Sequence, residues 1–582
     1  MGNNGDELLT TGLTFGDADD LDIVGIGNFH KTLPHNKFGE VDPKAYALFK
    51  NVATHSGEYE TVPAGYTGTN EPPEANFIKL PVPNFADKLN NPQSARVRDL
   101  LTGPTTDYAM TAAPSVRSLS TAAEMTELQW MAILRDTPFI NLNTTNTDVM
   151  AAIDDIKQHY SNALAANEPG GLRLGTDLPR DGNNVRIDQE TLFRCGLLGE
   201  DKGPLVSQFF LHDIGYGAQF IVQKVRPYRT GSDYLTDHGT WLLAQNSGRD
   251  LWGNGYSRDN DLAVSNIAEP GPPRRLTTMR DIARFVNKDA LHQAYFNAAL
   301  LCLQWNVPMQ PGNPYLGYHR QGGFGTFGGP EVLTRVSEVA SRALAIAWRQ
   351  KWEVHRRLRP EAYGGLMQMQ RVGLEDSGTF TKRAYGLPVA VFTSEASKRA
   401  LLRGARNYYL PMAFTAGSPP HPSYGAGHAT VAGACVTVLK AWFAGKTKLA
   451  PLLLRAGRNP FDDTTIVISQ TSIAGVLVDY MGTDASEMTV EGELNKIACN
   501  VAMGRSMGGV HWRSDNTRSL RLGEQIATEL LRAESLGYAE KNYADGALPY
   551  WSFTSFDGDE VVIHAGRVLV SGVPVDPKSG PL

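Results

Sequence analysis

The sequence has no run of about 18 consecutive apolar residues, so it predicts no helix that could span a membrane. Its first residues, Met1 to Asp6, also lack the basic stretch followed by an apolar one with which a secretory signal peptide begins. By default, we therefore expect a cytoplasmic protein that is not bound to a membrane.

Cysteine is scarce. The four cysteines are Cys195, Cys302, Cys435 and Cys499, and no two of them form the closely spaced pairs that indicate a zinc site or a redox dithiol. The sequence therefore favours free, buried thiols.

A basic excess is also missing, because 55 lysines and arginines stand against 61 aspartates and glutamates, for a formal net charge of -6. This balance gives no reason to expect a nucleic acid as partner. It does not exclude a local basic pocket, since a cleft focuses the field of the few charges that line it. The hydrophobic share of 42% and the charged share of 20% are typical of a globular protein with a large core.

Residues 1–118 are rich in Gly, Pro, Asn and Asp and show little periodicity. Short apolar stretches at residues 46–49 and 77–80 would anchor such a segment on the rest of the protein. We interpret the segment as an ordered wrapping arm used in oligomerisation, because arms of this kind often cover a neighbouring subunit.

From Thr121 onward, apolar residues recur at helical spacing. Thr121 and Glu124 match a capping box, which predicts that a helix begins there. The same periodicity, or a long apolar stretch without Gly or Pro, predicts further helices at residues 148–165, 277–305, 331–358, 394–406, 430–444, 489–507 and 516–536. Near the end, apolar stretches on both sides of Asp557-Gly558 indicate a β-hairpin.

Long helices that alternate with loops predict an all-α fold, mainly two helical bundles with long loops and a minor C-terminal β-hairpin. We expect three parts. They are the arm at residues 1–118, a first helical bundle at 119–310, and a second bundle at 311–582 that carries the functional site and the hairpin.

Three stretches of the chain combine residue types that suit an oxyanion site. The first runs from Gly504 to Asp515 and contains Arg505, a Gly-Gly bend and His511. Arginine offers a planar fork of donors to an oxyanion, and one histidine nitrogen can bind a metal while a carboxylate orients the other. If a helix resumes near His511, Asp515 lies on the same face one turn later. The alternative is an ordinary helix break with a solvated arginine and a core histidine.

The second stretch, residues 351–360, ends the helix predicted at 331–358. Pro360 keeps Arg359 out of the α region, so the chain can turn there and bring Lys351 and Arg359 together. The alternative is a solvated basic helix end, to which we assign Arg356 and Arg357. We interpret His355 as structural.

In the third stretch, residues 418–430, a proline-rich approach leads to Gly425-Ala426-Gly427 and then to His428 at the start of an apolar helix. A helix N-terminus presents unpaired N–H groups to an anion, and Gly427 lets the backbone approach closely. His428 is placed to give or take a proton. A simple turn before a buried helix would explain the glycines and prolines but not histidines at both 421 and 428.

These stretches resemble, in family order, the motifs of the vanadium-dependent haloperoxidases. The similarity is greatest to the bromoperoxidases of red algae and cyanobacteria, because seven residues separate Lys351 from Arg359, as in those enzymes. The acid phosphatases, which share the oxyanion pocket, usually have one fewer. The matching motifs extend over the C-terminal part of the chain.

The resemblance implies one vanadate per subunit, with His511 as the ligand of the vanadium. The other implied contacts to the cofactor are at Lys351, Arg359, Ala426, Gly427 and Arg505. His428 and Lys351 would be the catalytic residues, and Asp515 would orient His511. Hydrogen peroxide would oxidise bromide to hypobromous acid, which halogenates an organic acceptor, and the protein would form a large homo-oligomer.

Two positions refine this expectation. The family usually has serine where this chain has Ala426, so a hydroxyl donor to the oxyanion is missing. His421 stands where similar bromoperoxidases have histidine and chloroperoxidases have phenylalanine. It would therefore line the halide side of the pocket and favour bromide.

Two other functions fit the same residues. In an acid phosphatase, His511 would attack phosphorus to form a phospho-histidine intermediate and His428 would protonate the leaving group. A non-catalytic phosphate-binding protein would keep the cations but would not need His428.

Overall fold

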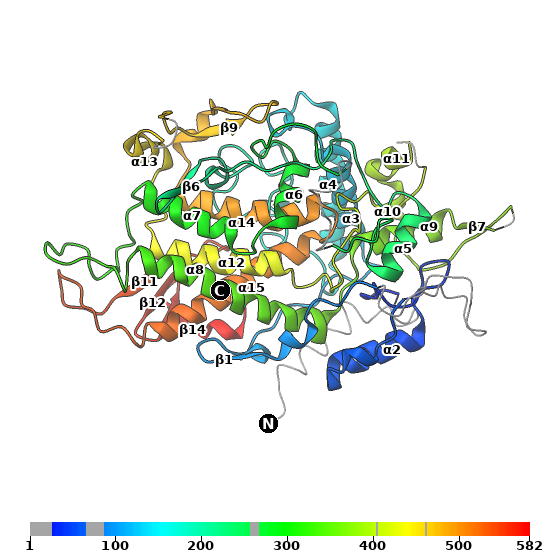
Figure 1. Cartoon of the computed structure of the whole chain (residues 1–582), viewed down its shortest axis with the longest axis horizontal. Helices are drawn as coiled ribbons and strands as arrows, with labels where there is room; N and C mark the ends of the chain where they lie inside the picture. The colour runs from blue at the N-terminus through cyan, green and yellow to red at the C-terminus, as the bar shows by residue number, and fades with distance from the viewer. Residues whose placement is uncertain (1–25, 66–85, 257–266, 377, 403–405, 460–462) are drawn as a thin grey trace.

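The computed structural model describes residues 26–65, 86–256, 267–376, 378–402, 406–459 and 463–582. The apolar stretch expected to act as an anchor at 77–80 lies outside these ranges, as does part of the helix expected at 394–406. Within them, most of the regular structure is helical (Figure 1).

Helix α12 (Gly427–Trp442) lies at the centre of the molecule and packs against α8 (Gly329–Arg349), α14 (Val490–Met507) and α15 (Arg513–Glu534) (Figure 1). Its side chains are apolar on nearly every face and almost all are buried. A helix that is hydrophobic all round must be enclosed by others, which is the arrangement observed. Because α12, α14 and α15 meet here, the first and third stretches lie inside the core.

A second group of helices consists of α3 (Leu119–Leu134), packed on α4 (Thr147–Ala166), α10 (Val389–Thr393) and α11 (Glu395–Leu402). The remaining helices of the main body are α5 (His238–Ser247), α6 (Met279–Lys288), α7 (Gln293–Gln304), α9 (Pro360–Arg371) and α13 (Leu449–Ala456). One hydrophobic cluster runs through both groups. The helix content predicted from periodicity is confirmed, while the division into three parts stays a prediction.

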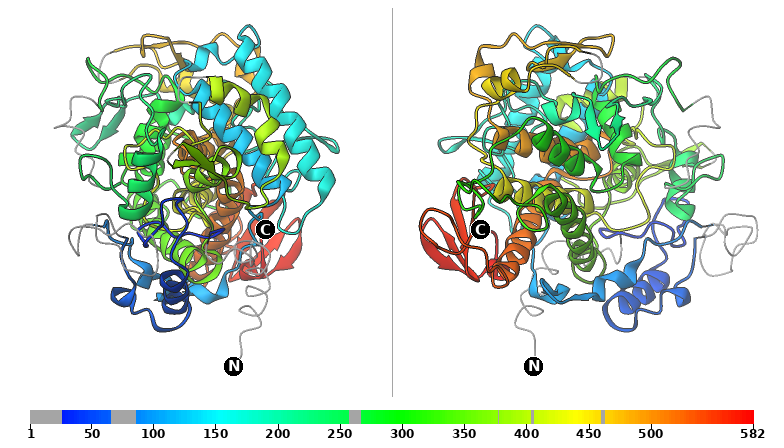
Figure 2. Two further views of the ribbon diagram at one scale, coloured as in Figure 1. Left: turned by 90° about the vertical axis from the view of Figure 1, so that its right-hand side faces the viewer. Right: turned by 60° about the vertical axis from the view of Figure 1, so that its left-hand side comes forward.

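The described part of the predicted arm packs on its own chain. Helix α2 (Pro43–Asn51) and its neighbours form a small aromatic cluster around Trp352, next to the second stretch. Lys31 is buried and its Nζ lies 2.7 Å from Glu361 Oε1. Figure 2 shows this segment, in dark blue, on one side of the helical body.

The all-α expectation is too coarse, because the C-terminal end forms a four-stranded antiparallel sheet rather than a hairpin. Its strands follow one another in order: β11 (Tyr550–Thr554), β12 (Glu560–His564), β13 (Arg567–Val570) and β14 (Val573–Val575). Asp557-Gly558 lies in the first turn, as expected, and Gly558 has a φ of 96°. The sheet lies at the edge of the molecule (Figure 2), with Trp551 stacked on Trp442 of α12.

The other strands form small antiparallel pairs in the loops. They are β1 (Arg98–Asp99) with β2 (Gly103–Pro104), β3 (Arg180–Asp181) with β4 (Asn184–Val185), β5 (Ile214–Tyr216) with β6 (Gln219–Ile221), β7 (Leu374–Asp376) with β8 (Thr379–Thr381), and β9 (Ser469–Thr471) with β10 (Leu477–Asp479).

Two helix predictions are wrong in a way that matters for function. The helix expected at 277–305 is two helices, because Asp289 adopts an extended conformation between α6 and α7. The helix expected at 331–358 ends at Arg349 and continues as a π-helical turn, Gln350–His355. Neither break contains glycine or proline, so neither left a signal in the sequence.

The capping box predicted at Thr121 is also wrong. The helix begins earlier, and the Ser118 hydroxyl caps it by accepting the Thr121 N–H at 3.0 Å. The Glu124 carboxylate instead binds Arg357 and Ser514 in the core.

We predict that Gly433→Ala destabilises the protein through the contact between α12 and α15. A β-carbon at this position would lie 1.9 Å from the Leu520 carbonyl oxygen, which belongs to a helical backbone that cannot move alone. Overpacking of this kind costs about 1–3 kcal/mol. Urea unfolding should show a lower midpoint than in Gly322→Ala, where an added methyl group meets nothing within 4 Å. Equal midpoints would contradict the prediction.

Candidate active site

The three stretches predicted to form an oxyanion site converge on Arg359. Its Nη1 donates to the Val510 carbonyl at 2.7 Å and lies 3.0 Å from His511 Nε2. Its Nε and Nη2 contact the His421 carbonyl and ring at 3.0 and 2.8 Å. The turn expected before Pro360 is present, since Arg359 is extended, with φ −79° and ψ 150°, and α9 begins at the proline.

Lys351 reaches the same place from the π-helical turn. Its Nζ donates to the carbonyls of Pro422 and Ser423 at 2.8 and 3.1 Å, and it lies 5.6 Å from the centre of the Trp348 ring. The side chain is fully buried. The π-helical turn thus directs the Lys351 ammonium group toward the backbone of the third stretch rather than toward solvent.

Arg505 lies in the last turn of α14, immediately before the predicted bend. Gly509, with φ 86°, makes this bend possible, because residues with a β-carbon rarely adopt that conformation. Nη1 of Arg505 donates to the Val286 carbonyl at 2.6 Å and to the hydroxyl of Tyr256. The arginine is therefore held between α14 and the end of α6.

His511 is oriented by Asp515, as the sequence predicted. Its Nδ1 lies 3.0 Å from Asp515 Oδ2, and because a carboxylate only accepts, Nδ1 carries the proton. The lone pair of the imidazole is then on Nε2, which faces Arg359. Asp515 also accepts from the Trp512 N–H at 3.0 Å and from the Ser423 hydroxyl.

The solvated basic helix end expected at Arg356 and Arg357 is wrong, because both side chains are buried. Arg357 donates to Asp515 Oδ1 at 2.7 Å and to Glu124 Oε2 at 2.8 Å. It thereby balances the charge of the carboxylate that holds His511. His355, which we interpreted as structural, packs edge-on against Tyr424.

Ala426 and Gly427 form the start of α12. Ala426 occupies the N-cap position, where its methyl group offers no hydrogen bond to the first turn. A β-carbon on Gly427 would lie 2.9 Å from the Trp348 ring. The glycine thus lets the helix N-terminus come against Trp348, which itself contacts Lys351 and packs on His421.

His428 binds Asp289, the residue that interrupts the predicted helix at 277–305. Its Nε2 lies 3.0 Å from Asp289 Oδ1, so this nitrogen carries the proton and Nδ1 is left as the base. Burial lowers the pKa of His428, as does the Arg505 charge, while Asp289 opposes the shift. The neutral imidazole is therefore favoured near pH 7.

The cations of the site destabilise one another. Burial, followed by the charges of Arg359 and Arg505, lowers the pKa of Lys351 well below its ordinary value. Burial and the Arg505 charge lower the pKa of Arg359 to about 9. The pKa values of His421 and His511 are also well below normal, first through burial and then through these neighbouring cations. Such a cluster would be stabilised by a multiply charged anion.

Three residues of the site were missed by sequence reasoning: Asp289, Trp348 and Tyr256. Asp289 lay within an apparently uninterrupted helix, and Tyr256 lies in a loop without a motif. Trp348 stands three residues before Lys351, a spacing that places it on a neighbouring helix position and could have indicated it.

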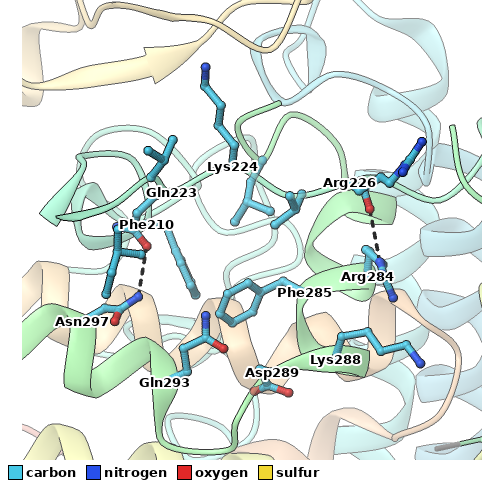
Figure 3. A pocket seen from close by; sticks show the side chains of 14 residues that line it. Phe210, Gln223, Lys224, Arg226, Arg284, Phe285, Lys288, Asp289, Gln293 and Asn297 are labelled. Atoms are coloured by element: carbon cyan, nitrogen blue, oxygen red, sulfur yellow. Dashed lines mark hydrogen bonds between the residues drawn. The ribbon is translucent and has the colours of Figure 1, made fainter. Parts of the chain in front are cut away.

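A pocket of about 210 Å³ lies beside the site, between α6, α7 and residues 221–226. Figure 3 shows Asp289 at its edge, near Phe285, Lys288 and Gln293. None of the cations predicted to hold an oxyanion lines this pocket. Asp289 therefore stands between a surface cavity and His428.

Comparison with known proteins shows which family the chain is similar to. Residues 387–536 match the family model described as the VCPO second helical-bundle domain. The chain is 31% identical to a vanadium-dependent bromoperoxidase of Corallina pilulifera over 616 residues, which cover 96% of this chain and 94% of that protein. It is 30% identical to one of Ascophyllum nodosum, covering 88% of this chain and 83% of that protein.

A solved structure supports the same relationship. The homohexameric second vanadate-dependent bromoperoxidase of Ascophyllum nodosum, AnII, matches with a TM-score of 0.76 and 26% sequence identity. The match covers 99% of this chain and 92% of that one. The similarity therefore includes the N-terminal half, for which the sequence motifs gave no evidence.

We predict that Asp289→Asn lowers the pKa of His428 further, because the carboxylate is the group that raises it. The pKa can be measured by NMR titration of the histidine rings, with His428→Gln to assign the signal. Asp188→Asn, in the loop at 186–191, is the matched control and should leave the titration unchanged. A His428 pKa that does not fall in Asp289→Asn would show that the contact is not formed.

Proposed function

Since the chain belongs to the family of vanadium-dependent bromoperoxidases, we propose that Lys351, Arg359 and Arg505 hold its vanadate, one per subunit. The protein is an oxidoreductase that uses hydrogen peroxide to oxidise bromide to hypobromous acid, which halogenates organic compounds. One observation carries the assignment of the site. The unprotonated Nε2 of His511 faces the guanidinium of Arg359, in a region bordered by buried cations.

The residues present fit a vanadate ion. Lys351, Arg359 and Arg505 are buried, and they donate mainly to carbonyl oxygens rather than to carboxylates. The cations thus retain charge for an oxyanion, which needs several such partners to leave water. The N–H groups at the start of α12, including that of Gly427, add donors at the positive end of the helix dipole.

When bound, vanadate supplies a Lewis-acid centre at which hydrogen peroxide is activated. His511 Nε2 is its protein ligand in this proposal, and Asp515 keeps the imidazole in the required tautomer. Lys351, Arg359 and Arg505 would donate hydrogen bonds to the oxygens of the ion. Lys351 would also stabilise negative charge on an oxygen of the bound group, so we assign it a catalytic as well as a binding role.

His428 is the acid–base residue. Asp289 holds its Nε2, so Nδ1 is the nitrogen that takes a proton from hydrogen peroxide and later returns one. The lowered pKa keeps His428 neutral, and hence able to accept a proton, at physiological pH. Its side chain is 15% exposed, more than that of His511, so it lies on the side from which substrate arrives.

His421 lines the halide side of the pocket. Its Nδ1 accepts from Arg359, so Nε2 carries the proton and can donate a hydrogen bond to an anion. The ring also packs on Trp348, at a centroid distance of 5.0 Å. These contacts support a role in favouring bromide.

We also propose that the subunits assemble into a large homo-oligomer, to which the arm at 1–118 contributes. The support is the homohexameric state of the similar Ascophyllum bromoperoxidase. Among the described residues, no helix is both long and apolar enough to cross a membrane.

The function is tested by bromination of an activated diketone with hydrogen peroxide and bromide. We expect activity that is lost when vanadate is removed and restored when orthovanadate is added. His511→Ala should stay inactive at the same vanadate concentration, because the ligand of the metal is missing. Hydrolysis of an aryl phosphate without bromination would instead identify a phosphatase.

We predict that Ala426→Ser binds vanadate about ten- to a hundredfold more tightly. The new hydroxyl would donate to the oxyanion, and a hydrogen bond to a charged group contributes about 1.5–3 kcal/mol. The dissociation constant can be measured by titration. Serine at this N-cap would also stabilise α12. A higher unfolding midpoint with an unchanged dissociation constant would show that the hydroxyl only caps the helix.

A further inference from the structure

Two cysteines and a glutamate that the vanadate site does not use meet where the turn at residues 195–200 packs on α14. One ligand atom each of Cys195, Glu200 and Cys499 lies within 4.8 Å of the other two, and all three residues are buried. Zinc–sulfur bonds of about 2.3 Å and zinc–oxygen bonds of about 2.0–2.2 Å place tetrahedral ligand atoms within this range. The cluster therefore has the dimensions of a metal site.

The ligand atoms are already oriented. Glu200 Oε1 accepts the N–H groups of Leu197, at 2.9 Å, and Gly196. Its Oε2 is buried and has no N–H or O–H donor among the described residues. The Cys195 N–H lies 3.2 Å from Cys499 Sγ, a contact that stabilises a thiolate. Gly196, with φ 88°, provides the tight turn that brings Cys195 beside Glu200.

The surrounding charges also suit a bound cation with anionic ligands. Two thiolates and one carboxylate around a divalent ion carry a net charge of −1. Arg194 donates to the Glu200 carbonyl oxygen, and its charge favours the ionised form of the Glu200 carboxyl. Burial opposes these ionised forms and raises the pKa values of Glu200 and Cys499. A metal ion would supply the missing stabilisation.

A pocket adjoins the cluster on the side of Glu200. This pocket, of about 450 Å³, is lined by Gly196, Leu197, Gly199 and Glu200. Three protein ligands leave the fourth tetrahedral position for water from this side.

We propose that Cys195, Glu200 and Cys499 bind one Zn²⁺ or a similar thiophilic divalent ion. The ion joins the turn at 195–200 to α14, the helix that ends beside Arg505. The site is separate from the vanadate pocket. The four cysteines are free and buried in the structure, as expected from the sequence. Cys195 and Cys499 are 304 positions apart, far beyond the spacing of any zinc motif, so no motif indicated a shared ion.

The test measures metal in the full-length protein produced with zinc in the medium. We expect about one zinc per chain by mass spectrometry, and at least a tenfold lower content in Cys499→Ser. Cys302→Ser is the matched control, since Cys302 is also a buried thiol but lies outside the cluster. It should retain the metal.

A spectroscopic measurement covers the case in which Cys499→Ser does not fold. Replacement of zinc by Co²⁺ in the wild-type protein should give a thiolate-to-cobalt charge-transfer band, absent from cobalt bound by oxygen and nitrogen alone. A wild-type protein that takes up neither metal would overturn the proposal, as would zinc that remains in Cys499→Ser. A mass two hydrogens lower, from a bond between Cys195 and Cys499, would show a disulfide instead.

Discussion

The buried carboxylate of Asp515 is the contact on which the rest of the site depends. It binds the imidazole of His511, the guanidinium of Arg357 and the hydroxyl of Ser423, so one side chain joins all three stretches. A charge at this depth is tolerable only because it is fully paired, and Arg357 in turn requires Glu124 from α3. The ligand nitrogen of His511 is thus positioned by a network that extends across the core.

The cations that face the cofactor are held differently. Lys351, Arg359 and Arg505 are fixed mainly by backbone carbonyls, whose partial charges orient the side chains without neutralising them. This arrangement costs stability, as the lowered pKa values of Lys351 and Arg359 indicate. The repulsion among these cations also favours binding of a highly charged oxyanion, because the negative charge of the ion would relieve it. The packing of the helices around α12 must offset the free energy of folding that this repulsion costs.

The sequence allowed the residues of the site to be predicted where the chemistry was local. Pro360 fixed the turn at Arg359, Gly509 allowed the bend after Arg505, and the four-residue spacing placed Asp515 beside His511. It failed where a residue acts through a distant partner. Asp289 leaves its helix to bind His428, and Arg357 is neutralised by a glutamate 233 positions away. Hydrophobic periodicity indicates the secondary structure of one segment. It carries no information on which distant residues that segment will contact.

The ion pair between Lys31 and Glu361 has a consequence for how the protein is made. These partners are 330 positions apart, and Glu361 also receives the Ser418 N–H at 2.6 Å beneath the third stretch. Contacts this distant along the chain form late, because a long loop must close first. The segment around Lys31 can therefore dock only once the part of the chain around Glu361 is present. Through Glu361, the N-terminal segment thus supports the backbone of the third stretch, so loss of that segment would disturb the site without removing any of its ligands.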